Sequence, residues 1–198
     1  SAMGTHVTIL ERNPRILKME EPEISDVAQK RFGRFAKIYT YFEAVRVEKE
    51  GGVKVVHAKD LAQKKLYKFK TDEIMLALGR RSNADLFKPG AAGIAIDKGG
   101  WIRVNEYLET NKPGIYAFGD AIGKYMFRHT ANYEAEVVWH NLEAKEMVKV
   151  DFSTVPHAVF GYPQIGSVGM TQEEAKAAGH NLLIGMAKYT DVAKGYAM

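Results

Sequence analysis

The stretch that decides the fold is PGIYAFGDAIGKYMFRHTA, residues 113–131. An apolar run ends at Gly119-Asp120, a turn with Gly123 follows, and a helix is expected to begin within residues 126–129. The free backbone N–H groups and the positive dipole end of that helix would lie beside the Asp120 carboxylate. The pattern predicts a sheet edge suited to a polar, partly anionic ring system, although Asp after Gly is also a common turn residue.

Length and composition restrict the class of protein. The chain has 198 residues, of which 46% are hydrophobic and 26% charged, so it can bury one large core or two smaller ones. The net charge of +4 comes from scattered Lys and Arg, which does not favour a nucleic-acid partner. There is no apolar run of about 18 residues and no signal-peptide pattern, so we expect no membrane partner and a cytoplasmic location. The absence of Cys excludes disulfides and thiol chemistry within these residues.

Hydrophobic periodicity predicts alternating strands and helices. A buried strand at residues 6–10 and an amphipathic helix within 21–36 come first, and a β-meander over 38–78 ends in a second buried strand at 74–78. Residues 80–100 are expected to be a loop, with two short strands in 101–118 and a helix over 129–147. In the last part of the chain, the pattern predicts strands at 156–161, 165–169 and 182–189, with a helix capped by Thr171 before the final strand.

Two strand ends carry candidate ligand contacts. Glu11 follows the first strand, and a carboxylate at that edge can accept hydrogen bonds from both hydroxyls of an adenosine ribose while repelling a 2′-phosphate, which favours NAD over NADP. The glycine-rich loop that usually precedes such a carboxylate is absent, so Glu11 also fits a solvated strand-end acid. Gly79 ends the run LALG, where a ligand can approach the backbone closely or the chain simply turns.

The histidines do not predict a metal site. Six are present, and none has a partner at i+4. His129, at the start of the expected helix, fits a capping or packing residue better than a base.

Four motifs stand together in a family-specific order. They are GTHVTILERNPRIL at 4–17, LALGRRSNADLF at 76–87, TNKPGIYAFGDAIGKYMFRHTANYEAE at 110–136 and VPHAVFGYPQIGSVGMTQEEA at 155–175. In this order and at this spacing the chain resembles the pyridine nucleotide-disulfide oxidoreductases, and within them it looks most like the dihydrolipoamide dehydrogenase branch. The final YTDVAKGYAM, residues 189–198, looks like the matching stretch of the mycothione reductase branch.

The resemblance implies an α/β fold in three incomplete parts. Residues 1–79 would form a partial Rossmann-like NAD domain, 80–149 the returning C-terminal part of an FAD domain, and 150–198 the start of an α+β dimerisation domain. A homodimer is therefore expected. Sheet edges and apolar surface left uncovered by the missing parts would also favour association.

The resemblance also implies two cofactors, FAD and NAD. Asp120 would hold the ribityl chain of FAD, and Glu11 and Gly79 would contact NAD, with Phe42 packing near the adenine. Backbone groups at the start of the helix would line the flavin, at Met126, Phe127, Arg128 and His129. The family usually has a small residue where Arg128 stands.

The implied reaction of the parent enzyme passes two electrons from a dithiol through a disulfide to FAD and then to NAD. Dihydrolipoamide is the first substrate that the resemblance suggests. A sister reductase acting on mercuric ion, glutathione or mycothiol is the alternative within the family, and a catalytically inactive dimerisation module is the alternative outside it.

No residue of this chain is assigned a catalytic role. The family's redox cysteines and N-terminal FAD segment would precede Ser1, and its acid/base histidine and glutamate would follow Met198. We therefore interpret the chain as a fragment that is inactive alone and binds FAD weakly or not at all, because a flavin normally also needs its pyrophosphate loop.

Overall fold

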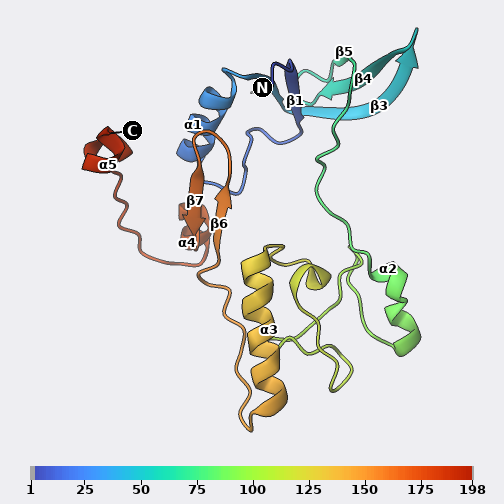
Figure 1. The fold of residues 1–198 in the computed structure, drawn as a ribbon, viewed down its shortest axis with the longest axis vertical. Coiled ribbons are helices and arrows are strands. Elements are labelled where there is room, and N and C mark those ends of the chain that lie inside the picture. Colours follow the sequence, from blue (N-terminus) through green and yellow to red (C-terminus); the bar gives the residue numbers. More distant parts are fainter. Residues whose placement is uncertain (1–2, 198) are drawn as a thin grey trace.

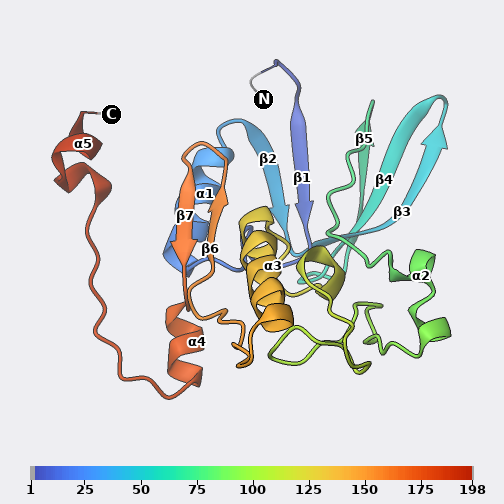
Figure 2. The ribbon, with the colours of Figure 1, turned by 60° about the horizontal axis from the view of Figure 1, so that its bottom comes forward.

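The β-branched run near the start of the chain forms a parallel strand pair joined by one helix. The computed structural model describes residues 3–197 and places β1 (Val7–Glu11), α1 (Pro22–Phe32) and β2 (Ala36–Thr40) in this order (Figure 1, with β2 labelled in Figure 2). Pro22 stands at the helix start, where its missing N–H costs nothing. The strand forms as predicted, but its expected burial is wrong, because Thr8 and Ile9 are exposed. Within the described residues β1 pairs only with β2, so its other edge has no hydrogen-bonded strand.

A three-stranded antiparallel sheet follows, which confirms the predicted meander. Its strands are β3 (Phe42–Glu50), β4 (Val53–Asp60) and β5 (Leu66–Thr71), with β4 in the centre. Gly51 and Gly52 form the β3–β4 turn with φ of 55° and 91°. The central strand holds the buried residues of the sheet, Val55, Val56, His57, Ala58 and Asp60.

The buried strand predicted at 74–78 is wrong. Residues 73–83 have no regular secondary structure, and Met75 and Leu78 are 91% and 87% exposed. A strand needs a hydrogen-bonded neighbour, and no described strand lies beside this segment. It instead connects β5 to the next part of the fold as an extended run (Figure 1).

The middle of the chain packs around one long helix. The elements there are α2 (Ala84–Phe87), the 3₁₀ helices η1 (Pro89–Ala92) and η2 (Gly119–Ile122), and α3 (Arg128–Glu143). Instead of the two strands predicted in 101–118, only isolated bridges form, joining Ile96 to Ile102 and Glu109 to Tyr116. The core is made by Leu108, Val137 and Val138, packed against Val104, Tyr116, Ile122, Val150 and Phe152.

The C-terminal part is a hairpin followed by short helices. β6 (Pro156–Val159) pairs antiparallel with β7 (Ile165–Val168), and α4 (Gln172–Ala177), η3 (Tyr189–Asp191) and α5 (Ala193–Tyr196) follow. The predicted cap is confirmed, because Thr171 and Glu174 form a capping box. The strand predicted at 182–189 is wrong: residues 182–188 have no regular secondary structure and run between α4 and η3 (Figure 2), and Leu183 is fully exposed.

The hairpin β6–β7 lies beside α1 in both views (Figures 1 and 2), so the last part of the chain returns to the first. Three hydrogen bonds accepted by Glu20 and Glu21 join these distant segments. Among residues 3–197, no helix is long and apolar enough to cross a membrane.

The turn after η2 requires a glycine at position 123. Gly123 has φ of 68°, and a Cβ there would collide with the indole ring of Trp101. Gly114 has a similar φ of 77°, but its Cβ would meet no atom within 4 Å. We expect G123A to lower the free energy of unfolding by about 1–3 kcal/mol more than G114A, because only the first adds overpacking to backbone strain. Urea unfolding of both variants measures this difference, and equal losses would contradict the steric role of Trp101.

Candidate functional site

A buried glutamate on α3 holds the Gly119-Asp120 turn in place. Gly119 has φ of 65°, and its N–H donates a hydrogen bond to Oε2 of Glu134, a side chain with no exposed surface. A Cβ on Gly119 would lie 3.1 Å from that of Ala131, so the turn packs directly on α3. The Asp120 side chain, in contrast, is 61% exposed at the front of the turn.

Glu134 was missed by the sequence analysis. It lies on the inner face of α3, one turn after the buried Thr130, and burial raises the pKa of its carboxyl group. Its Oε1 and the Thr130 hydroxyl both lack a hydrogen-bond partner. A glutamate on the apolar face of an amphipathic helix was the signal that could have found it.

The loop after Gly79 reaches the same place. Gly79 has φ of 96°, and the following Arg80 donates from Nη1 to Asp120 Oδ2 at 3.0 Å and to the Met126 carbonyl at 3.1 Å. The structure therefore joins Gly79 to the Asp120 turn, whereas Glu11 lies on the β1–β2 pair. Arg80 was not singled out from the sequence, because its partners are 40 and 46 residues away.

The residues at the start of α3 form a stack of rings. Phe127 is the N-cap residue, and its ring is nearly parallel to that of His129, with centroids 5.5 Å apart. His157, from β6, lies parallel to Phe127 at 5.8 Å. His129 Nε2 donates to the Pro156 carbonyl at 2.7 Å, which fits the packing role considered for this histidine. Arg128 is exposed.

Glu11 and Phe42 belong to different sheets, Glu11 to the β1–β2 pair and Phe42 to the β3–β4–β5 sheet. Glu11 is the last residue of β1, and its Oε1 accepts hydrogen bonds from the backbone N–H and the side-chain amide of Asn13 at 2.7 and 2.6 Å. Its register partner is Thr40, two residues before Phe42. The Phe42 ring belongs to an aromatic cluster with Tyr39, Tyr67 and Phe69.

A group of possible metal ligands lies on β3 and β4 of the three-stranded sheet. Ligand atoms of Glu48, Glu50 and His57 lie within 4.8 Å of one another, an arrangement made by strand pairing that sequence spacing did not reveal. Each carboxylate already pairs with a cation, Glu48 with Arg46 and Glu50 with Lys68. Charge pairing therefore accounts for this group.

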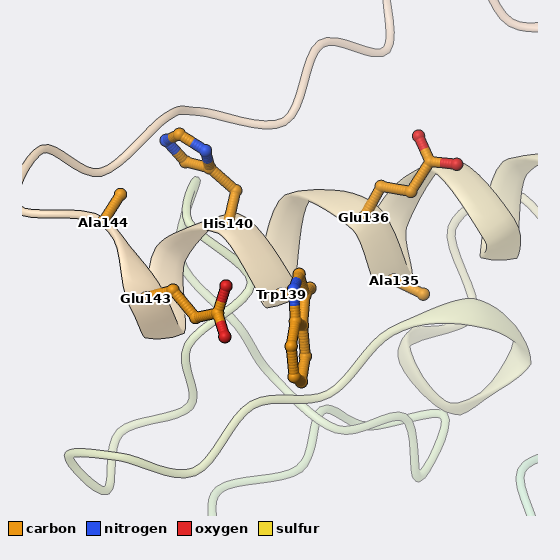
Figure 3. A pocket seen from close by; sticks show the side chains of 6 residues that line it. All are labelled: Ala135, Glu136, Trp139, His140, Glu143 and Ala144. Carbon is orange, nitrogen blue, oxygen red and sulfur yellow. The ribbon is translucent and has the colours of Figure 1, made fainter.

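A shallow hollow on the solvent side of α3 holds none of the predicted site residues (Figure 3). Trp139 projects beside it and is 63% exposed, and the polar side chains around it, Glu136, His140 and Glu143, are exposed too. Side chains so open to solvent do not form a ligand site.

The raised pKa of Glu134 predicts a pH dependence of stability. The folded chain binds the Glu134 proton more tightly than the unfolded chain, whose glutamate pKa is about 4.5, so the free energy of unfolding falls as pH rises from about 4.5 through the folded pKa. E134Q cannot ionise and still accepts from Gly119. We expect it to gain stability relative to wild type over this range, by about 1.4 kcal/mol for each unit by which the pKa is raised.

Urea unfolding from about pH 4 to 8 measures this effect. E136Q, on the exposed face of the same helix, is the matched control. Parallel curves for wild type and E134Q would show that Glu134 titrates normally.

Comparisons with known proteins agree with this architecture. Residues 1–135 match the family model "pyridine nucleotide-disulphide oxidoreductase", and residues 155–198 match its dimerisation domain. Mycothione reductase of Mycobacterium tuberculosis is 34% identical over 100% of this chain and 43% of the relative. Dihydrolipoyl dehydrogenase of Rhizobium etli is 31% identical over 100% of this chain and 41% of the relative. Mercuric reductase of Lysinibacillus sphaericus is 31% identical over 91% of this chain and 33% of the relative. The chain thus spans less than half the length of these relatives.

A solved structure has the same arrangement. The HOCl-induced flavoprotein disulfide reductase RclA from Escherichia coli superposes with a TM-score of 0.77 at 27% identity, over 90% of this chain and 40% of that one. The α/β fold accordingly combines part of a Rossmann-like NAD domain, the returning part of an FAD domain and the start of an α+β dimerisation domain. The chain belongs to the pyridine nucleotide-disulphide oxidoreductases, a family that uses FAD and NAD(P).

Proposed function

We propose that this chain is part of an FAD-dependent dithiol/disulfide oxidoreductase in which electrons pass from dihydrolipoamide through FAD to NAD. Residues 1–79 belong to the NAD domain in this proposal, 80–149 to the FAD domain and 150–198 to the dimerisation domain of a homodimer. The 31% identity to a dihydrolipoyl dehydrogenase over the whole chain supports the substrate class. The single observation that carries the proposal is the Asp120 turn at the start of α3.

The residues around this turn fit a flavin. The α3 helix is 16 residues long and has no side-chain cap at its N-terminus, so its first N–H groups are free to meet an anionic ring edge. Gly119 keeps the backbone close to α3, and the exposed Asp120 carboxylate can accept hydrogen bonds from the hydroxyls of a ribityl chain. Bound flavin would accept and pass on the electron pair, and a helix N-terminus stabilises the negative charge of its reduced form.

Two charged side chains near the turn have defined tasks in this proposal. Arg80 bridges Asp120 and the Met126 carbonyl, so it orders the turn and the residues before α3 together. Because Arg80 and Asp120 are 57% and 61% exposed, their ion pair contributes little stability and can rearrange around a ligand. Met126, Phe127, Arg128 and His129 would then contact the flavin mainly through the backbone.

In this proposal the dinucleotide contacts are Glu11 at the end of β1, Phe42 at the start of β3, and Gly79. Both hydrogen bonds from Asn13 converge on Oε1 of Glu11 and fix its carboxylate at the end of β1, where it can accept from ribose hydroxyls. Phe42 presents an aromatic ring two residues beyond the Glu11 register partner, suited to adenine. Gly79 is assigned to NAD by family resemblance alone.

A mycothiol disulfide is the second candidate substrate. The specific observation in its favour is the 34% identity to mycothione reductase over the whole chain, slightly above that to the dihydrolipoyl dehydrogenase. Electrons would then run in the opposite direction, from the nicotinamide through FAD to a disulfide. The contacts proposed at Asp120 and Glu11 bind the cofactors in the same way for either direction of electron transfer.

We expect D120N to weaken FAD binding about tenfold, because an amide replaces a charge-assisted acceptor for the ribityl hydroxyls. The intact mass and visible spectrum of the purified chain come first, followed by FAD titration of wild type and variant. D85N, on α2, removes another exposed carboxylate that pairs with a neighbouring arginine, and it should leave FAD affinity unchanged. Equal FAD affinities of wild type and D120N would contradict a flavin contact at Asp120.

We expect wild type to bind NADH more tightly than NADPH, and E11Q to lose most of this preference. The glutamine keeps an acceptor for Asn13 but carries no charge to repel a 2′-phosphate. Titration calorimetry with both dinucleotides measures the ratio, and NADH affinity should fall about tenfold. E43Q is the control, since Glu43 lies near Glu11 in the fold and pairs with Arg12. An unchanged NADH to NADPH ratio in E11Q would remove Glu11 from the ribose site.

A further inference from the structure

We infer that the buried Glu20 cluster, formed by Glu20, His157 and Ser167, positions the Phe127 ring at the start of α3 and so couples the first part of the chain to the flavin contacts. This inference rests on the proposed function for its last step, the effect on flavin. His157 is a positioning residue in this scheme, because it touches Phe127 and no reacting group.

Both oxygens of the Glu20 carboxylate accept a hydrogen bond. Glu20 is 4% exposed, its Oε1 accepts from His157 Nε2 at 2.7 Å, and its Oε2 accepts from the Ser167 hydroxyl. These partners lie on β6 and β7, 137 and 147 residues away in the sequence. A carboxylate can only accept, so the proton of the His157 bond is on Nε2. Moving either partner away would leave an oxygen of the buried carboxylate without its hydrogen bond, which costs free energy. The His157 and Ser167 side chains are therefore held in one orientation toward Glu20.

The segment that carries Glu20 is itself fixed to α1. Ser25 is completely buried on the first turns of the helix, and its hydroxyl donates to the Ile16 and Leu17 carbonyls. Beside it, Glu21 accepts from the Gln172 N–H at 2.6 Å, which adds a second contact to the returning chain. These hydrogen bonds therefore fix the position of the segment that carries Glu20.

His157 transmits this position to the proposed flavin contacts. Its ring lies at 5° to that of Phe127, which in turn lies at 6° to that of His129, giving three nearly parallel rings. His129 is also held to the backbone of β6 by its bond to the Pro156 carbonyl. Rotation of the His157 ring away from Glu20 would break the stacking, and Phe127 immediately precedes the free N–H groups of α3. His157 is thus the side chain that connects the Glu20 carboxylate to Phe127, the N-cap residue of α3.

The test removes the carboxylate and observes the rings. In E20A, the NMR resonances of the Phe127 and His129 rings should shift, because ring stacking depends on the orientation of His157. E20Q should restore them, since its amide oxygen accepts from His157 and its amide nitrogen donates to Ser167. E23A, which removes an exposed carboxylate from the first turn of α1, should leave both rings unchanged.

Two further variants, H157A and S167A, allow the test to be made even if E20A does not fold. If E20A does not fold, H157A gives the readout on His129 and Phe127 instead. S167A removes the other hydrogen bond of Glu20 but leaves His157 in place, so it should lower the thermal stability with a smaller ring shift than E20A. Equal shifts in S167A and E20A would overturn the specific role of His157. Lower stability of E20A with unmoved rings would overturn the inference altogether.

The link to flavin has its own readout. FAD affinity of E20A should be roughly tenfold below that of wild type, the equivalent of one charge-assisted hydrogen bond, and E20Q should recover it. If the rings move and FAD affinity does not, the coupling to flavin is wrong. If D120N binds FAD as tightly as wild type, the proposed flavin contact at Asp120 fails, while the ring shifts still decide whether Glu20 positions Phe127.

Discussion

The hydrogen bond from the Gly119 N–H to the Glu134 carboxyl is the contact on which the candidate site depends. It fixes a left-handed glycine to the inner face of α3, and this places the exposed Asp120 carboxylate beside the uncapped helix start. A buried carboxyl group in a low-dielectric position is costly unless it is neutralised or well bonded, and the raised pKa of Glu134 is the expression of that cost. The buried group is tolerated because it replaces solvent as the partner of a strained turn.

The parts of the fold that were predictable from sequence are those whose pattern is satisfied locally. The β3–β4–β5 meander contains its own hydrogen-bonded neighbours, and α4 carries both halves of its capping box within four residues. The runs at 74–78 and 182–189 are just as apolar, yet neither is a strand, because no described strand lies beside them to accept their hydrogen bonds. Apolar periodicity predicts the tendency to pair, and pairing itself depends on the neighbour.

The same distinction separates the site residues. Asp120 and Phe127 to His129 are contiguous with the turn and the helix start, so a local motif predicts their proximity. Arg80, Glu134 and Glu20 could not be assigned this way, because each acts on a partner at least 15 residues distant. Glu134 left a faint signal as a charge on an apolar helix face, whereas Glu20 in MEEPE is indistinguishable by sequence from the exposed Glu23 that follows it.

Burial decides which of the long-range contacts hold the parts together. The Arg80–Asp120 pair is more than half exposed on both sides, and pairs of this kind contribute about 0–1 kcal/mol, so it can yield to a ligand. Glu20 is buried with both oxygens bonded, and removing one partner of a buried pair typically costs about 3–5 kcal/mol. The docking of β6–β7 on the first part of the chain is therefore the rigid element, and the Asp120 turn is the adaptable one. A ligand that replaces Arg80 at Asp120 would meet a helix start whose position is already set from the other side, through His157 and Phe127.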